Sequence, residues 1–243
     1  MGKTKGQSNS NYTPTSAKRG RAAVSFQNLS FSAAYKYLMV TIGIDYSITS
    51  PAITVFDGRH YTFISLFDVD VKDWRNSKKY AVHNEIQDFV PIYPFSRSVD
   101  KTTYQTEQRS KTINAEQLAT LTTHTARFAA GDGDIRIALE GFSYASKGMA
   151  SLDLVMYQSV LRVRMMEEFG IGSIHVFSPT EAKKLAGKGN YGKEQMVEAF
   201  ARNVLNDGIL AEHPFHQYVF KNGLKGKPVD DLVDSYFLLK CLD

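Results

Sequence analysis

The chain has 243 residues, a formal net charge of +4 and 43% hydrophobic residues, enough for the core of one sizeable domain. Its single cysteine, Cys241, excludes an internal disulfide and favours a reducing compartment. No apolar run approaches the ~20 residues that span a bilayer, and the first residues lack the apolar core of a secretory signal. We therefore expect a soluble, intracellular protein with no membrane segment.

The positive charge is concentrated at the N-terminus. From Met1 to Ile44 there is no Asp or Glu, but there are six Lys and Arg residues. The abundance of Ser, Asn, Gly and Thr predicts a disordered basic tail over residues 1–36. Three roles remain open for this tail: a passive solubilising end, a nonspecific contact with a polyanion, and a mitochondrial transit peptide.

The domain that follows, residues 37–243, opens with three predicted strands. The segment Tyr37–Asp45 is apolar nearly throughout, and SPAITVFDG and RHYTFISLF form a hairpin around the turn signal Asp57-Gly58. From about Asp68 to Lys111, charged and aromatic residues mix without a regular period. This change of pattern predicts an insertion between core elements.

Helices and strands alternate in the rest of the chain. We predict a helix over Asn114–Ala130, a strand over Asp134–Phe142, an amphipathic helix over Ser151–Phe169, a strand over Ser173–Phe177, and helices over Lys193–Leu205 and the final VDDLVDSYFLLKCL. The order of these elements predicts a mixed α/β fold, in which a five-stranded sheet is flanked by helices.

Two short motifs suggest ligand sites but lack the required context. GKGNYGKE (Gly187–Glu194) fits the phosphate-binding loop G-x-x-x-x-G-K-[ST] except at Glu194, where a hydroxyl must bind magnesium. The segment SPTEAKKLA also separates this motif from the nearest strand. His213 and His216 have ligand-like spacing, but Pro214 between them disfavours a helix. We expect these histidines to be loop residues rather than zinc ligands.

Acidic residues stand at the ends of apolar elements. Asp45 ends the first strand and Glu140 lies near the end of the fourth, and the last helix carries Asp230, Asp231 and Asp234 at i, i+3 and i, i+4 spacing. Converging carboxylates repel one another unless cations lie between them, and hard oxygen ligands suit Mg²⁺ or Mn²⁺. Two such ions would activate a water and stabilise the leaving oxygen of a phosphodiester. The alternative is that each acid is an independent cap or a solvated charge.

Three stretches that contain these acids resemble the RuvC-type Holliday-junction resolvases of the RNase H-like superfamily. GIDYSITSPAITVF is similar to the family's first strand, ALEGFSYASKG to its second acidic strand, and KPVDDLVDSYFLLK to its closing helix. The resemblance implies an RNase H-like fold from about Tyr37 onward, outside the insertion. The doubled Asp230-Asp231 and Ser235 are most similar to the branch found in poxviruses, phages and mitochondria, which implies a phage or viral source and the host cytoplasm.

The resemblance also implies the site residues. The catalytic, metal-binding acids would be Asp45, Glu140, Asp231 and Asp234, with two Mg²⁺ or Mn²⁺ ions, and with Asp231 preferred to Asp230. Lys193 would take part in catalysis. The DNA-binding residues would come from the basic loop and from the segment after Glu140: Lys183, Lys184, Lys188, Phe142, Tyr144 and Lys147. In this interpretation GKGNYGKE approaches DNA phosphate, and the alternative is a solvated basic loop.

The activity implied is metal-dependent cleavage of branched DNA, the four-way junction, by paired symmetric nicks, which requires a homodimer. The helix over Ser151–Phe169 is the expected dimer element, because its apolar residues spread beyond one stripe. Another RNase H-like nuclease, acting on flaps or branches or in DNA packaging, and a noncatalytic DNA-binding scaffold remain alternatives. A sugar-kinase or actin-like ATPase needs two such domains, for which the chain is too short. The insertion either contacts junction arms through its aromatic and basic residues or is a surface elaboration.

Overall fold

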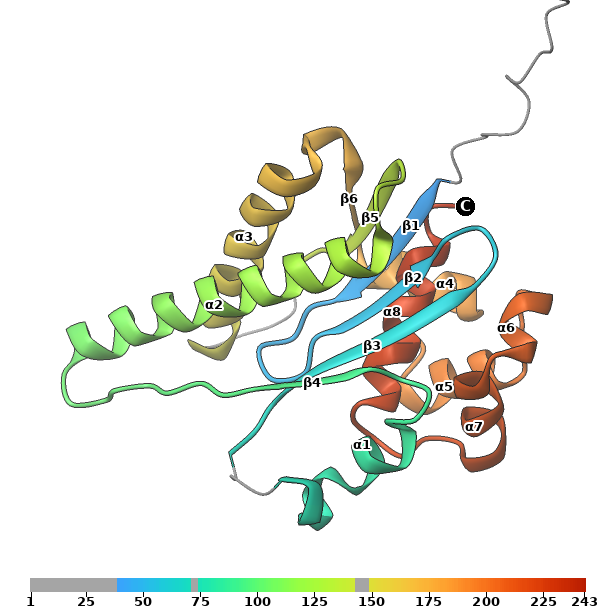
Figure 1. Cartoon of the computed structure of the whole chain (residues 1–243), viewed down its shortest axis with the longest axis horizontal. Helices are drawn as coiled ribbons and strands as arrows, with labels where there is room; N and C mark the ends of the chain where they lie inside the picture. The colour runs from blue at the N-terminus through green and yellow to red at the C-terminus, as the bar shows by residue number, and fades with distance from the viewer. Residues whose placement is uncertain (1–38, 71–73, 143–148) are drawn as a thin grey trace, which may run out of the picture. The chain divides into compact units, whose positions relative to one another are not determined.

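The computed structural model describes residues 39–70, 74–142 and 149–243, which form a sheet with helices on both faces (Figure 1). All of these residues belong to one compact unit of the chain. The predicted tail over residues 1–36, and Tyr144 and Lys147 among the expected DNA-binding residues, lie outside the described residues. Of the helices described, none combines the length and the apolar character that crossing a membrane requires.

The described residues form strands and helices in the following order. The strands are β1 (Val40–Asp45), β2 (Ala52–Phe56), β3 (Tyr61–Asp68), β4 (Ile92–Phe95), β5 (Ile135–Glu140) and β6 (Ile174–Phe177). The helices are α1 (Ala81–Ile86), α2 (Tyr104–Ala130), α3 (Met149–Phe169), α4 (Pro179–Ala186), α5 (Lys193–Ala201), α6 (Gly208–Glu212), α7 (Pro214–Asn222) and α8 (Val229–Lys240). Short 3₁₀ turns cover Trp74–Asn76, Lys78–Tyr80 and Ile171–Ser173.

The strands form one mixed sheet with the order β4-β3-β2-β1-β5-β6. Neighbours among β1, β2 and β3 are antiparallel, whereas β5 runs parallel to β1, and β6 parallel to β5. The predicted α/β class is confirmed: the described residues form a mixed sheet flanked by helices. The expected number of five strands is wrong for the described residues, because β4 pairs with β3 as a sixth strand.

The sixth strand comes from the predicted insertion, where Pro94 interrupts the strand-favouring residues of IYPF. Pro94 has no backbone N–H to donate, and proline within a strand is therefore confined to edges and bulges. β4 lies at the edge of the sheet, so one side of its backbone has no neighbouring strand to pair with. The position at the edge explains why the structure tolerates a strand that the sequence does not predict.

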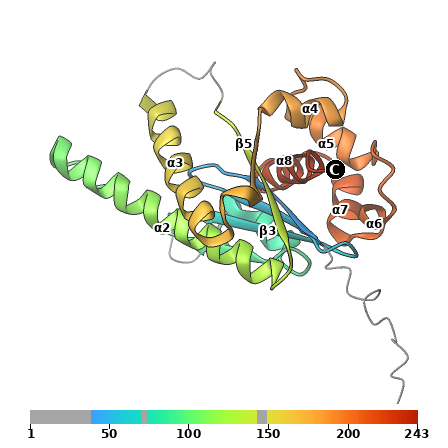
Figure 2. The ribbon, with the colours of Figure 1, turned by 90° about the horizontal axis from the view of Figure 1, so that it is seen from above.

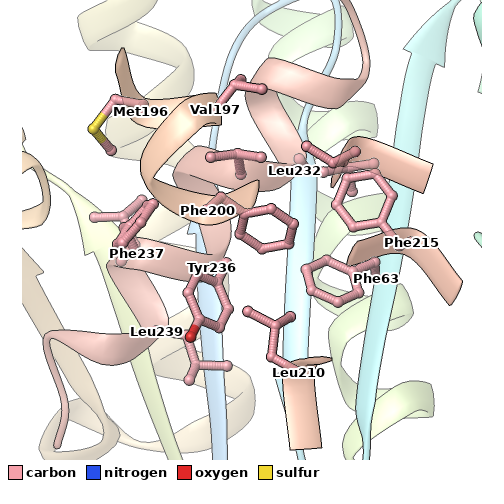
Figure 3. Packing of buried hydrophobic residues seen from close by; sticks show 14 of the residues in the cluster. Phe63, Met196, Val197, Phe200, Leu210, Phe215, Leu232, Tyr236, Phe237 and Leu239 are labelled. Carbon is pink, nitrogen blue, oxygen red and sulfur yellow. The ribbon is translucent and has the colours of Figure 1, made fainter. Parts of the chain in front are cut away.

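The two faces of the sheet have different partners. Figure 2 shows α2 and α3 on one side and α8 with α4, α5, α6 and α7 on the other. Because side chains alternate along a strand, Ile42 and Ile44 of β1 enter the core shared with α2 and α3. Phe63 of β3 enters the opposite core, where Figure 3 shows it beside Phe200 of α5 and Phe215 of α7.

Helix α8 crosses β1 and β2 closely. A Cβ atom added at Gly43 would lie 2.5 Å from the backbone nitrogen of Leu239 and nearer still to the carbonyl oxygen of Ser235. The Ser235 hydroxyl also hydrogen-bonds the hydroxyl of Thr54 in β2 at 2.6 Å. Gly43 therefore permits the close contact between α8 and the sheet. The hydrogen bond between Ser235 and Thr54 fixes that contact.

α2 and α4 are among the helices that begin where the sequence did not predict a helix start. α2 starts at Tyr104 rather than Asn114, because Thr103 and Thr106 form a capping box within a polar segment. The predicted insertion, ending at about Lys111, therefore runs into this helix. The segment PTEAKKLA, predicted only as a basic connection, forms α4 with its own capping box from Ser178 and Glu181.

The expectation that His213 and His216 are loop residues is wrong for His216. Pro214 occupies the first turn of α7, where its missing N–H is not needed. His213 caps this helix, since its Nδ1 accepts a hydrogen bond from the backbone N–H of Phe215 at 3.0 Å. His216 is buried inside α7. The proline therefore starts a helix instead of preventing one.

Candidate active site

Asp45 and Glu140 reach the same edge and the same face of the sheet. β1 and β5 are parallel, and Ile44 lies opposite Leu139. The next residue of each strand is acidic, so Asp45 lies beside Glu140. Ile44 and Leu139 belong to the core shared with α2 and α3. Alternation along the strands therefore turns Asp45 and Glu140 toward α8, the helix that carries the remaining acids.

The carboxylates of β1, β5 and α8 interact with one another. Burial raises the pKa of Asp45 well above its usual value, and the charges of Asp231, Asp234 and Glu140 raise it further. Burial also raises the pKa of Asp234 to about 7; the charge of Lys193 opposes this rise, and the charges of the neighbouring acids add to it. The structure thus brings together the four acids that the sequence singled out.

Lysines surround this carboxylate cluster. The Lys193 ammonium, at the first residue of α5, pairs with Asp230 and lies 3.6 Å from Oδ1 of Asp231. Lys227, just before α8, lies 3.1 Å from Oδ2 of Asp231. Lys183 of α4 opposes the burial that raises the pKa of Glu140. Positive charge therefore reaches the cluster from three separate segments.

Asp231 is more central to the cluster than Asp230. In addition to burial, the charge of Asp231 helps to raise the pKa of Asp45, of Glu140 and of Asp234. Asp230 acts on Asp231 and Asp234, and its Oδ2 receives the Lys193 ammonium. This difference agrees with the preference for Asp231 that the sequence resemblance implied.

The donor set suits a hard divalent cation. Burial raises the pKa of each of the four acids, which indicates that their negative charge is incompletely compensated. Oδ1 of Asp230 is buried without a hydrogen-bond partner among the described residues. As the described side chains stand, no three Asp, Glu, His or Cys residues are gathered closely enough to share one ion. The chemistry and the charge of the site fit Mg²⁺, and the lysines now supply part of the compensating charge.

The other predicted basic residues lie on α4 and the loop after it. Lys184 and Lys188 are exposed there. The glycine motif folds back on α4, because a Cβ atom at Gly189 would lie 2.5 Å from Cγ2 of Thr180. The motif ends where α5 begins with Lys193. GKGNYGKE therefore leads into the helix start that faces the acids.

Phe142 follows β5 and is half-buried. The guanidinium of Arg162 in α3 lies 4.1 Å from the centre of its ring, a cation–π contact. Arg162 also donates a hydrogen bond of 3.3 Å to the carbonyl oxygen of Glu140. Phe142 is thus held near the acidic end of β5.

Sequence reasoning missed Lys227 and Ser50. Lys227 precedes Asp231 by four residues, the spacing of a helical ion pair, and this signal was available in the sequence. Ser50 lies in the loop between β1 and β2, and its hydroxyl favours the ionised form of Asp231, opposing the burial that raises its pKa. Only the fold brings that loop to α8, so no local pattern indicates Ser50.

Comparisons with known proteins give structural neighbours only. No protein-family model matches the chain, and no curated protein matches it either. A structure of RuvC from Thermus thermophilus aligns with a TM-score of 0.45 at 16% identity, covering 82% of this chain and 92% of RuvC. The T. thermophilus RuvC in complex with a Holliday junction substrate aligns with a TM-score of 0.44 at 15% identity, with the same coverage.

Proposed function

We propose that the protein is a metal-dependent endonuclease that cuts four-way DNA junctions. One observation carries this proposal: four carboxylates from β1, β5 and α8, of which Asp231 is buried and the other three are partly buried, act on one another beside three lysines. Buried acids that repel one another destabilise a fold, so a role with a bound cation gives a reason for their arrangement. The lysines give the negatively charged backbone of DNA a place beside the acids.

Asp45, Glu140, Asp231 and Asp234 are the residues that would hold the metal, Mg²⁺ or Mn²⁺. When bound, two such ions supply Lewis-acid activation of water and charge stabilisation at the phosphodiester. The protein's own contribution is positional. The β1–β5 register fixes two carboxylates, and the close crossing of α8 over Gly43 fixes the other two.

The lysines and the start of α5 orient the DNA strand. Lys193 and the free backbone N–H groups at the N-terminus of α5 would bind oxygens of the phosphate to be cut. Lys183, already near Glu140, together with Lys184 and Lys188, would bind the neighbouring backbone phosphates. Phe142 would stack on a base beside the cut, supported by Arg162.

Paired nicks in a symmetric junction require two such sites, which we propose come from a homodimer through α3. The buried side chains of this helix are Tyr157, Gln158, Leu161 and Met165. Leu152 is 62% exposed and Val163 is 55% exposed. These apolar side chains remain available to a second copy of the chain.

The test is cleavage of a labelled synthetic four-way junction beside matched duplex, flap and single-stranded DNA, with Mg²⁺ or Mn²⁺. We expect paired nicks in the junction, and Asp45→Asn should slow them by about three orders of magnitude. Asp132→Asn is the matched control, because Asp132 is exposed before the opposite end of β5. Equal cutting of all substrates would indicate a broader nuclease, and no cutting with either metal would indicate a DNA-binding scaffold.

A further inference from the structure

Two short segments, one in the predicted insertion and one between α7 and α8, expose basic side chains. Residues 74–80 and residues 221–227 each contain three Lys or Arg residues and no Asp or Glu. All of these basic side chains are exposed. They are Arg75, Lys78 and Lys79 in the first segment and Lys221, Lys225 and Lys227 in the second. Both segments are therefore suited to an anionic partner.

The fold brings the two segments together. The Tyr218 hydroxyl of α7 donates a hydrogen bond of 2.6 Å to Glu85 of α1, and the Tyr218 ring lies 5.9 Å from that of Phe89. Figure 1 shows α1 beside the chain that runs from α7 into α8. Lys79 and Lys227, one from each segment, line the same pocket of about 310 Å³. The six basic residues thus form one surface, which we call the second basic surface.

The second basic surface reaches the carboxylate cluster. Lys227 lies 3.1 Å from Oδ2 of Asp231, and the pocket that it lines extends to the end of β3. In the sheet order, β1 and β5, which carry Asp45 and Glu140, lie between β3 and β6. The basic residues of α4 and the loop after it follow β6. Positive charge therefore flanks the acids on two sides, beside β6 and beside β3.

Most of the charge on the second basic surface is not compensated by neighbouring acids. Within the part of the chain that the structure describes, only two of its six basic side chains form ion pairs. Lys79 pairs with Asp70 and Lys227 with Asp231. The other four are exposed and remain available to a partner.

The aromatic residues of the insertion do not take part in this surface. Trp74 is 8% exposed and Tyr80 is 4% exposed, and both rings pack against Phe67. The Arg75 guanidinium lies over the Trp74 ring, 5.0 Å from its centre. Stacking on a base requires an exposed ring face, so the insertion offers charge to a partner and not a stacking platform. Exposed lysines without aromatic neighbours suit phosphate groups, whose contacts position DNA without reading its sequence.

We propose that the second basic surface binds the phosphate backbone of one duplex arm of the junction. This inference rests on the proposed junction-cutting function and gives the insertion a role in affinity. The cut strand lies over the acids and α4, and the arm extends from there toward the insertion. DNA is favoured over an acidic protein as the partner, because Lys227 makes this surface continuous with the site where the strand would be cut.

The first test is the salt dependence of junction binding, measured by fluorescence anisotropy with Asp45→Asn protein in EDTA. Lys78→Glu and Lys225→Glu are each added to this protein. Each lost phosphate contact lowers the slope of log affinity against log salt by about one, so we expect that change and at least an ~eightfold loss of affinity at about 0.1 M salt. Arg59→Glu is the matched control, because Arg59 is exposed in the β2–β3 turn at the opposite end of the sheet.

The control makes the same change of charge far from the acids and should keep the slope, with its affinity within about twofold. Melting temperatures of all variants would show that they are folded. If Lys78→Glu and Lys225→Glu bind with the slope and affinity of Arg59→Glu, this inference is wrong, even where the wild-type protein cuts the junction. Failure of the wild-type protein to cut any junction with Mg²⁺ or Mn²⁺ would instead contradict the proposed function. Failure of the Asp45→Asn protein to bind any junction would overturn both.

The second test locates the contact on the DNA. Junctions with progressively shorter arms are bound to Asp45→Asn protein with and without Lys78→Glu. The two affinities should differ for long arms and converge once the arms no longer reach the insertion, because the phosphates that Lys78 contacts are then missing. A difference that is the same at every arm length would contradict an arm contact.

A polyglutamate peptide distinguishes DNA from an acidic protein. We expect it to bind much more weakly than the junction, because it lacks the contacts at the carboxylate cluster. Peptide binding as tight as that of the junction, and equally weakened by Lys78→Glu, would make this a surface for acidic proteins and would overturn the inference.

Discussion

The close crossing of α8 over β1 predicts a strong effect of Gly43→Ala on both stability and cutting. The new methyl group would lie 2.5 Å from Leu239 N and 2.8 Å from Leu239 Cβ, and nearer still to Ser235 O. Backbone atoms cannot rotate away as a side chain can, so α8 must retreat by roughly 1 Å to restore normal packing. Overpacking of this kind costs about 3 kcal/mol, the upper end of its usual range.

The same displacement should reach the carboxylate cluster. Asp234 directly precedes the contact residue Ser235, and Asp231 lies one helical turn before it. A displacement of about 1 Å typically lowers a catalytic rate by ~100-fold. Thermal unfolding should show a melting temperature lower by about 6–12 °C for a domain of this size. Gly172→Ala is the matched control, because an added Cβ there meets no atom within 4 Å. A Gly43→Ala protein that melts and cuts like the control would refute the close-crossing argument.

Three further predictions concern acid stability, metal binding and assembly. Burial lowers the pKa of His83 to about 4, so between about pH 6.5 and pH 4 this histidine is protonated in the unfolded chain but not in the folded one, and the protein loses stability as the pH falls. The His83→Phe variant should lose about 2 kcal/mol less than the wild type between pH 7.5 and pH 4.5, as measured by urea unfolding. Equal losses in the two proteins would contradict this prediction. Asp234→Asn should stabilise the protein by about 2 kcal/mol at pH 8 in EDTA, because one repelling buried charge is gone, and Mg²⁺ should then stabilise the wild type more than the variant. Replacing Leu152 and Val163 together by Glu should yield a monomer in sedimentation velocity, whereas Ile171→Glu, exposed outside α3, should leave the assembly unchanged.

The acids could be predicted because apolar strands are simple signals. β1 and β5 are largely apolar strands that end in a carboxylate, and a carboxylate in that position is rare enough to indicate a functional site. The spacing of Asp231 and Asp234 indicates a shared helical face in any fold. The convergence of these three segments follows from the sheet order, which the resemblance supplied and the local pattern alone did not.

Other features depend on contacts between segments far apart in the sequence. β4 is stable because β3 offers it a partner, although Pro94 weakens its own propensity. Ser50 reaches Asp231 only because β1 and β2 pair beneath α8. The start of α2 and the helical place of His216 have local causes, a threonine capping box and a proline in the first turn. Polar residues and proline, which usually interrupt helices, are here the residues that start them.

The grouping of Phe67, Tyr80, His83 and Lys227 around one pocket shows the same limit. Phe67 ends a predicted strand, whereas Tyr80 and His83 have i, i+3 spacing in the stretch of mixed composition that follows. Their grouping depends on the packing of α1 beside the end of β3, together with Lys227 from a distant segment. An insertion that looks irregular in sequence thus forms an ordered wall in the structure.

The central claim is that one carboxylate cluster performs metal-dependent cleavage, and the most direct measurement changes its four acids one at a time. Asp45→Asn, Glu140→Gln, Asp231→Asn and Asp234→Asn proteins would be compared with the wild type in single-turnover cutting of a four-way junction with Mg²⁺, while junction binding is measured with Ca²⁺. We predict that each variant binds within about threefold of the wild type and cuts at least about 100-fold more slowly. A variant set that cuts the junction at the wild-type rate would contradict the claim that these acids form the active site.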